Sequence, residues 1–300
     1  MDTAQYLVDG STPFILSDRC TAHVDTFANK QAGQEFLAQN ITKLDRLQSR
    51  FAADGRSALL VIIQGMDASG KDGVVRNVFS GMNQSGVDVR NFKAPTSDEL
   101  AHDYLWRIHK ALPQRGTIGV FNRSHYEDVL IGKVRKLYED QNILKRCKKP
   151  NTIEKRYRQI VEFERYLWEN AIIPVKFMLN ISRVEQARRF LSRIDDPTKN
   201  WKFSSADFDD RVYWDAYQHA YEECINATAT TRSPWYVIPA DNKWYTRAVV
   251  SQIVLEKMKA LKPKYPTMSQ ETLDQLAVYR EHLMQDDLNT FGCALTGGPS

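Results

Sequence analysis

The residues best suited to chemistry lie between Gly65 and Gly73, where the sequence reads GMDASGKDG. Glycines at both ends let the backbone turn tightly, so several main-chain N–H groups can converge on the oxygens of one anion. Lys71 adds a mobile cation, and the start of a following helix adds partial positive charge. The pattern predicts a phosphate- or nucleotide-binding loop, with a glycine-rich turn carrying a surface lysine as the simpler alternative. The candidate binding residues are Gly65, Met66, Ala68, Ser69, Gly70, Asp72 and Gly73.

Two carboxylates in this loop bear on metal binding. Asp72 stands where the common form of the loop has Ser or Thr, whose hydroxyl binds Mg²⁺. A carboxylate beside phosphates repels them unless a cation lies between, so we expect Mg²⁺ here. Asp67, inside the loop, is the better candidate ligand. For Asp72, metal binding and capping of the helix that it begins are equally supported.

A second polar motif, FNRSHYED from Phe121 to Asp128, follows another apolar run. Its first polar residue is Asn122, whereas many proteins with this kind of loop have an Asp there that holds the metal through water. Arg123 can grip a phosphate with two parallel N–H donors. Ser124 and Glu127 also fit a capping box for a helix that starts at this point, and both interpretations can hold together.

Basic residues continue along the segment from 183 to 206, which we expect to form a lid. Arg189 and Arg193 lie four residues apart on one helical face, and Pro197 ends that helix before a basic turn with Trp201. Closure of this segment would surround a phosphoryl group with cations and exclude water. The alternative is plain surface charge, with Glu185 paired to Arg189. The candidate lid residues are Arg188, Arg189, Arg193 and Lys199, and Lys202 is a candidate phosphate contact.

A denser basic run extends from Lys133 to Arg158, with ten basic residues against three acidic ones. Such a run predicts a surface that attracts a polyanion, with Lys133 and Lys136 as candidate channel residues. A solvated helix face followed by a lysine-rich loop is an equally weighted alternative. The net charge of +4 for the whole chain is too small to decide between them.

Apolar runs that alternate with amphipathic helical stretches would position these motifs. We expect strands at 57–65, 87–95, 117–123, 172–180 and 235–240, and helices from 71 and over 97–112, 126–138, 182–194 and 243–261. Strands that are apolar throughout are typical of a parallel sheet covered on both faces, which predicts a three-layer α/β/α fold. Ligands of such sheets bind beyond the carboxyl ends of the strands, where the polar motifs stand.

The remaining features of the chain indicate one main domain. We expect an N-terminal extension over 1–27, a phosphate-loop domain over 28–262 and a C-terminal extension over 263–300. No cationic start precedes an apolar run at the N-terminus, and the longest apolar stretch is too short to span a bilayer, which predicts a cytoplasmic protein. The four cysteines are scattered and suggest neither a zinc site nor a disulfide framework.

Six motifs occur in order along the chain: GMDASGKDG, FNRSHYEDV, ISRVEQARRF, DDPTKNWKFS, DRVYWDAYQHAYEECINATAT and PWYVIPADNKWYTR. Together they resemble the polyphosphate kinase 2 family over roughly Ala28 to Lys262. The form FNRSHYEDV is more similar to the subgroup that accepts both nucleoside mono- and diphosphates than to the subgroup with Asp in place of Asn122.

The resemblance implies a thymidylate-kinase-like fold with a lid, dependence on Mg²⁺, and phosphate transfer between inorganic polyphosphate and adenine nucleotides, with guanine nucleotides as further candidates. It also implies assemblies of two or four chains. We expect no membrane partner and no nucleic-acid partner. By the same resemblance, Asp67 organises the metal, while Lys71, Arg123 and Arg183 bind the phosphates. Because position 122 is Asn, Asp128 or water would complete the ligands of the metal.

Two rival functions share some of these features. A nucleoside monophosphate kinase that uses ATP has the same loop and a basic lid but needs no long cationic channel. A non-catalytic nucleotide- or nucleic-acid-binding module is the other. Against a guanine-nucleotide switch, the segment Asn242 to Tyr245 lacks the Asp expected after N-K-x.

Overall fold

The computed structural model describes residues 1–22 and 26–285, apart from the side chains of 206 and 207. Within that part a six-stranded sheet has the order β1-β6-β5-β2-β4-β3. The strands are β1 Leu7–Val8, β2 Ala58–Gly65, β3 Val87–Asn91, β4 Ile118–Asn122, β5 Ile172–Asn180 and β6 Trp235–Pro239. All neighbouring strands are parallel except β1, which runs antiparallel to β6. The expected parallel sheet is therefore confirmed, with one antiparallel edge strand that the sequence did not suggest.

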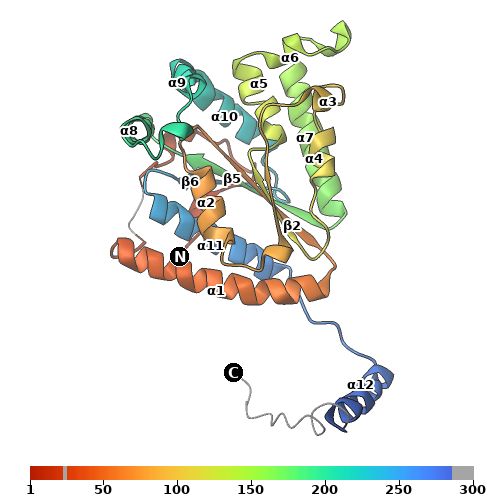
Figure 1. Cartoon of the computed structure of the whole chain (residues 1–300). Helices are drawn as coiled ribbons and strands as arrows, with labels where there is room; N and C mark the ends of the chain where they lie inside the picture. Colours follow the sequence, from red (N-terminus) through yellow and green to blue (C-terminus); the bar gives the residue numbers. More distant parts are fainter. Residues whose placement is uncertain (23–25, 286–300) are drawn as a thin grey trace. The chain divides into compact units, whose positions relative to one another are not determined.

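Helices cover both faces of the sheet (Figure 1). On one face lie α1 and α11, which contact each other along their lengths, together with α2 after the phosphate loop. On the other face lie α4, α7 and α10. The helices are α1 Lys30–Asp54, α2 Lys71–Val74, α3 Ser97–Leu100, α4 Trp106–Lys110, α5 Ile131–Val134, α6 Leu137–Asp140, α7 Thr152–Glu169, α8 Arg183–Ile194, α9 Ser205–Asp209, α10 Trp214–Thr228, α11 Lys243–Ala260 and α12 Gln270–Leu283. The three-layer architecture agrees with the fold class expected from the sequence.

Two expected helices are shorter than the sequence predicted. The stretch 97–112 forms α3 and α4 with a break between them, because the Asp103 carboxylate accepts the Leu105 amide and starts a new turn. The stretch 126–138 becomes a 3₁₀ turn, His125–Asp128, followed by α5 and α6. Ser124 caps that turn through the Tyr126 amide, and Lys136 has φ = 52°, which a continuous helix does not allow.

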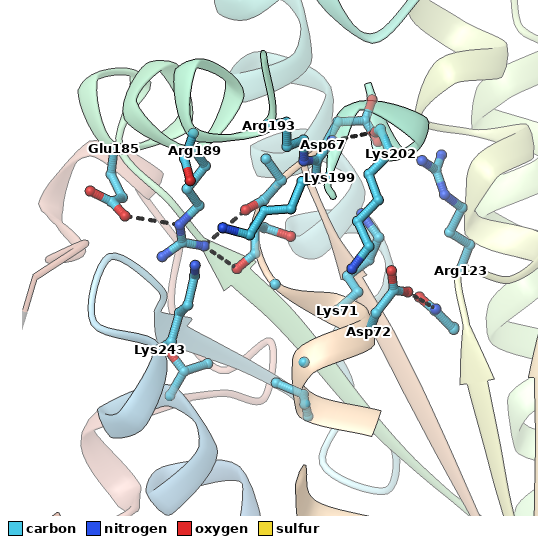
Figure 2. Close-up of a pocket in the computed structure, with 18 of the residues that line it drawn as sticks. Asp67, Lys71, Asp72, Arg123, Glu185, Arg189, Arg193, Lys199, Lys202 and Lys243 are labelled. Carbon is cyan, nitrogen blue, oxygen red and sulfur yellow. Dashed lines mark hydrogen bonds and ion pairs between the residues drawn. The ribbon is translucent and has the colours of Figure 1, made fainter. Parts of the chain in front are cut away.

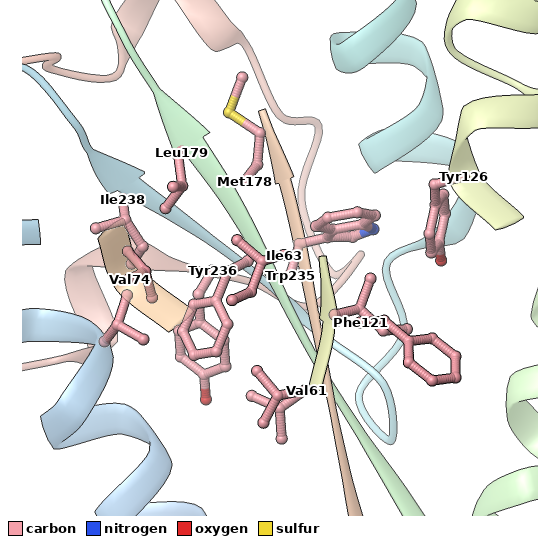
Figure 3. Packing of buried hydrophobic residues seen from close by; sticks show 14 of the residues in the cluster. Val61, Ile63, Val74, Phe121, Tyr126, Met178, Leu179, Trp235, Tyr236 and Ile238 are labelled. Atoms are coloured by element: carbon pink, nitrogen blue, oxygen red, sulfur yellow. The ribbon is translucent and has the colours of Figure 1, made fainter. Parts of the chain in front are cut away.

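The core lies on both sides of the central strands (Figure 3). Val61, Ile62 and Ile63 of β2 are fully buried, as are Val120 and Phe121 of β4. Because β2 lies between β4 and β5 and is covered on both faces, its side chains are apolar in both directions. This packing fixes the carboxyl ends of the strands, from which the polar motifs project.

One buried ion pair interrupts the apolar pattern of β5. Lys176 Nζ lies 2.7 Å from Glu164 of α7 and donates to the Tyr126 hydroxyl and the Thr228 carbonyl. Burial alone would raise the pKa of Glu164, but Lys176 and His125 outweigh it and lower the pKa to about 2. The pair therefore ties α7 and the turn that follows β4 to the sheet.

The chain divides into two compact units, Met1–Lys264 and Tyr265–Ser300. The first holds the sheet, including β1 from the N-terminal residues. The described part of the second holds α12, capped by Ser269, with Leu273, Leu276 and Tyr279 exposed. No helix within residues 1–22 and 26–285 has both the length and the apolar character needed to cross a membrane.

Candidate active site

The phosphate loop leaves β2 at Gly65 in a conformation that glycine permits. Gly65 has φ = 153° and Gly70 has φ = 107°. A Cβ at Gly65 would lie 2.7 Å from Ser69 Oγ and 2.9 Å from the Leu179 carbonyl oxygen. Ala68 has φ = 61°, a left-handed conformation that is costly for a residue with a side chain. The loop is thus held in a tight curve beside the end of β5.

Lys71 lies folded back on this loop. Its Nζ donates to the Gly65 carbonyl at 2.7 Å and to the Met66 carbonyl at 3.2 Å. Burial, followed by the Arg123 charge, lowers the pKa of Lys71 to about 8, although Asp67, Glu127 and Asp72 oppose the shift. An ammonium bound only to neutral carbonyls can turn to a phosphate, a stronger charged acceptor, without breaking an ion pair.

The ends of β3 and β4 bring further polar groups to the loop. Asn122 Nδ2 donates to Asp72 at 2.6 Å and to Asn91 Oδ1 at 2.8 Å. Arg123 has φ = 63° and forms two ion pairs, with Asp67 at 2.5 Å and with Glu127 at 3.2 Å. Glu127 is paired with Arg123, and Ser124 caps the turn through the Tyr126 amide without the reciprocal bond of a capping box. The loop carboxylates and the second motif form one connected network.

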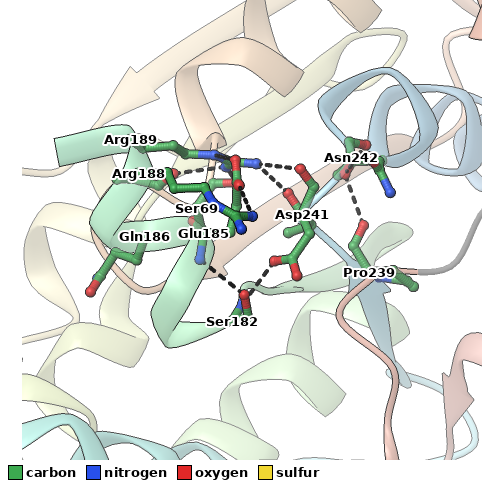
Figure 4. A network of polar contacts seen from close by, with 12 residues as sticks. Ser69, Ser182, Glu185, Gln186, Arg188, Arg189, Pro239, Asp241 and Asn242 are labelled. Atoms are coloured by element: carbon green, nitrogen blue, oxygen red, sulfur yellow. Dashed lines mark hydrogen bonds and ion pairs between the residues drawn. The ribbon is translucent and has the colours of Figure 1, made fainter. Parts of the chain in front are cut away.

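A second network fastens helix α8 to the phosphate loop (Figure 4). The Arg189 side chain is buried, and all five of its N–H groups donate hydrogen bonds. Nε donates to Glu185, Nη1 donates to the Ala68 and Ser69 carbonyls, and Nη2 donates to the Ala240 and Asp241 carbonyls. Gln186 adds a bond to the Asp67 carbonyl at 2.9 Å. Glu185 and Arg189 do form the ion pair that the surface-charge alternative expected. The same Arg189 side chain is buried between α8, the phosphate loop and the segment after β6, so the pair is not plain surface charge.

The loop forms the floor of a pocket of about 890 Å³ (Figure 2). Ten of the twenty-four residues that line it are Lys or Arg, and three are Asp or Glu. Figure 2 shows Lys71 and Asp72 between Arg123 on one side and Lys243 on the other, with Lys199 and Lys202 above them. An excess of positive charge around a phosphate loop is the environment that a polyanionic substrate requires.

The pocket gathers most of the residues expected from the sequence. Those that line it are Asp67, Ala68, Ser69, Gly70, Lys71, Asp72, Gly73, Asn122, Arg123, Arg188, Arg189, Arg193, Lys199 and Lys202. Gly65 and Met66 contribute the carbonyls that hold Lys71. Glu127 reaches the site through its pair with Arg123.

Apart from Gly65, Met66 and Glu127, four further expected residues do not line this pocket. Arg183 is exposed at the start of α8. Lys133 forms an ion pair with Glu223, and Lys136 is exposed between α5 and α6. Asp128 faces Arg156 at 3.4 Å, and its pKa is raised to about 6 by burial, against the opposing Arg156 and Arg107 charges.

The structure adds pocket residues that were not singled out in the sequence. Asn91 is the last residue of β3 and Lys93 follows it, while Lys243, Thr246 and Arg247 lie in the first two turns of α11 after β6. The rule that ligands bind beyond the carboxyl ends of parallel strands pointed to both places. The segment NKWY belongs to one of the six family motifs and departs from the guanine-recognition pattern, but neither observation indicated a role for Lys243.

The two carboxylates at the loop are suited to bind a divalent cation whose other ligands are substrate phosphates and water. Asp67 and Asp72 both line the pocket, and each has one oxygen bonded to a neighbouring side chain. Within residues 1–22 and 26–285 no group of three or more His, Cys, Asp or Glu side chains could enclose a metal. One or two carboxylates completed by phosphates and water is the usual coordination of Mg²⁺ in phosphoryl-transfer sites.

Comparison with known proteins identifies relatives that match most of the chain. The family model for polyphosphate kinase 2 matches residues 27–266. The chain is 45% identical over 270 residues to an ADP-polyphosphate phosphotransferase of Rhodopseudomonas palustris, covering 87% of this chain and 92% of that protein. It is 47% identical over 237 residues to an AMP/ADP-polyphosphate phosphotransferase of Meiothermus ruber, covering 79% and 85%.

A solved structure has the same fold. The crystal structure of polyphosphate kinase 2 from Arthrobacter aurescens TC1 superposes with a TM-score of 0.84 at 37% sequence identity. The match covers 92% of this chain and 95% of that one.

Proposed function

The chain belongs to the polyphosphate kinase 2 family, and we propose that it transfers phosphate between inorganic polyphosphate and adenine nucleotides, converting AMP to ADP and ADP to ATP. The observation that carries the proposal is the position of Lys71 on a glycine-bounded loop inside a pocket lined by ten basic side chains. A kinase that uses ATP needs cations for three phosphates, whereas a polymer of phosphates presents charge along its whole length.

The reaction transfers one phosphoryl group in line. An anionic oxygen of the acceptor's terminal phosphate attacks the last phosphorus of the polymer, and the bridging P–O bond to the next phosphate breaks. The nucleotide gains one phosphate, the polymer loses one, and the negative charge moves to the new polymer end. The attacking oxygen carries no proton, so the step needs no general base. His125, which is fully buried, is not required as one.

The side chains of the pocket would hold and align the two substrates. We assign the loop amides and Lys71 to the phosphoryl group being transferred, because that ammonium can leave the carbonyls of Gly65 and Met66. Arg123, now paired with Asp67 and Glu127, contacts the same group from the opposite side. Lys202, from the lid segment, supplies a third cation. Arg183, which is exposed at the start of α8, remains a candidate phosphate contact.

Mg²⁺ bound at Asp67, with Asp72 nearby, would neutralise charge on the phosphates and screen them from these carboxylates. Asp128 faces Arg156 and does not line the pocket, so the proposal places the metal at the loop. The expected assembly of two or four chains and the cytoplasmic location remain predictions, which light scattering and cell fractionation would test.

The direct test mixes the protein with Mg²⁺, polyphosphate and either ADP or AMP, and measures the new nucleotide. We expect ATP from ADP and ADP from AMP, and about a 100-fold lower turnover for Lys71→Ala, the typical value of one charge-stabilising group. Nucleotide formation no higher than in a protein-free control would contradict the proposal. Phosphorylation of AMP by ATP but not by polyphosphate would favour the rival kinase.

A further inference from the structure

A cluster of cations lies on the side of the pocket away from Arg123. Lys243 and Arg247 stand one turn apart near the start of α11, and both line the pocket. The guanidinium of Arg247 lies over the phosphate-loop helix: a Cβ added at Gly73 would be 3.1 Å from its Nη2. Figure 2 shows Lys243 reaching toward the Arg189 junction, on the opposite side of Lys71 from Arg123.

These cations have no fixed counter-charge. In the described part of the chain, the ammonium of Lys243 and the guanidinium of Arg247 form no hydrogen bond or ion pair, in contrast to Arg123 and Arg189. The nearby carboxylate of Glu185 is bonded to Arg189. Burial, then the charges of Arg189 and other cations, lowers the pKa of Lys243. Lys243 is exposed and Arg247 half-buried, so water screens part of their repulsion, and a bound polyanion would supply the missing counter-charge.

The local backbone adds to the positive potential. α11 has eighteen residues, and its N-cap residue, Asn242, forms no side-chain capping bond. The partial positive charge of the helix start therefore adds to that of the two side chains. The cluster continues from the phosphate loop without a break, because Gly73, Thr246 and Arg247 line one wall of the same pocket.

The basic run from Lys133 to Arg158 is less suited to a polymer that ends at Lys71. Lys133 is paired with Glu223 and Arg135 with Asp210, so part of its charge is already neutralised. Neither Lys133 nor Lys136 lines the pocket.

We propose that Lys243 and Arg247 form a subsite for the phosphates of the polymer that follow the one being transferred, so that the chain leaves the phosphate loop across the start of α11. This inference rests on the proposed function and adds the direction in which the polymer runs. Arg123 and Lys202 then lie on the nucleotide side of Lys71.

The test compares three double variants that each remove two positive charges. Lys243→Gln/Arg247→Gln removes the charges of the proposed subsite. Lys145→Gln/Lys149→Gln removes two charges from the basic run between Lys133 and Arg158. Lys259→Gln/Lys262→Gln is the matched control, at the far end of α11. Michaelis constants are measured for long polyphosphate, tripolyphosphate and ADP at several salt concentrations, with melting temperatures alongside.

For the subsite variant we expect the KM of long polyphosphate to rise about tenfold, as two lost charge contacts of ordinary strength imply. The KM of tripolyphosphate should rise less, and that of ADP should stay within about twofold. The salt dependence of the polymer KM should become shallower, because fewer counterions are exchanged. The melting temperature should be unchanged or higher, since a repulsion is removed.

An unchanged polymer KM, an equal rise in the control variant, or a rise confined to ADP would overturn the inference. If only Lys145→Gln/Lys149→Gln raises the KM of long polyphosphate, the polymer binds along the basic run from Lys133 to Arg158 and not at Lys243 and Arg247. If the unmodified protein forms no ATP from polyphosphate, the proposed function fails. Equilibrium binding of polyphosphate to the same variants then still decides whether this subsite exists.

Discussion

Replacing Arg189 should show that this residue positions the phosphate loop and does not bind substrate. Its five N–H groups are bonded to Glu185 and to four carbonyls from the phosphate loop and from the segment after β6. Arg189→Ala leaves these acceptors without their donor. Each net hydrogen bond contributes about 1 kcal/mol, and water entering from the pocket restores some of them, so we expect a loss of about 3–5 kcal/mol.

The assay is thermal and urea unfolding of Arg189→Ala, Arg189→Lys and Arg188→Ala. For a domain of this size the loss corresponds to a fall in melting temperature of roughly 10 °C. Arg189→Lys should lose about half as much, because an ammonium has three N–H donors in place of five. Arg188→Ala is the control for stability, since its side chain is 73% exposed and has a single contact at 3.7 Å with Glu185.

Turnover distinguishes positioning from general stability. At a temperature where every variant is folded, Arg189→Ala should lower kcat with little change in the polymer KM, and millimolar guanidinium should restore part of that kcat. Guanidinium should not restore Lys71→Ala. A melting temperature for Arg189→Ala within about 2 °C of the unmodified protein, or equal effects of Arg188→Ala and Arg189→Ala, would refute this reasoning.

Three further predictions follow from the same structure. Because the pKa of Lys71 is lowered to about 8, its charge is lost as the pH rises through that value, so kcat/KM should fall above pH 8. In Lys71→Arg this fall should occur at a higher pH. A kcat/KM that stays constant up to pH 9.5 in the unmodified protein would contradict the prediction. Lys176→Met should destabilise the protein by about 3–5 kcal/mol in urea unfolding, because Glu164 is left as an unpaired buried charge, and Glu164→Gln/Lys176→Met should recover most of the loss. Arg183→Ala should lower turnover by about 100-fold with an unchanged melting temperature, because its side chain is exposed; unchanged turnover would remove Arg183 from the site.

The sheet and the phosphate loop were predictable because they depend on local signals. Each apolar run became a strand close to its expected bounds, and the glycines around Lys71 marked the loop after β2. Lys176 is a charged residue within the otherwise apolar strand β5, and the strand still forms because Glu164 of α7 neutralises that charge. That partner is twelve residues away and was not apparent from periodicity.

The parts that escaped prediction depend on contacts between distant segments. Arg189 was expected to line a lid, but its acceptors at Ala68 and Ala240 lie more than fifty residues away along the chain. Asp128 was expected near the metal, yet the 3₁₀ turn after Ser124 places it against Arg156. Helical periodicity alone could not have revealed that turn, because the cap redirects the chain within four residues.

The central claim is that the amides of the phosphate loop and Lys71 bind the phosphates of the substrates. A crystal structure with Mg²⁺, a nucleotide and a non-hydrolysable polyphosphate analogue tests it most directly. We predict that phosphate oxygens accept hydrogen bonds from the loop amides and from Lys71, whose Nζ has left the carbonyls of Gly65 and Met66. Phosphates bound elsewhere, with Lys71 still on those carbonyls, would contradict the account.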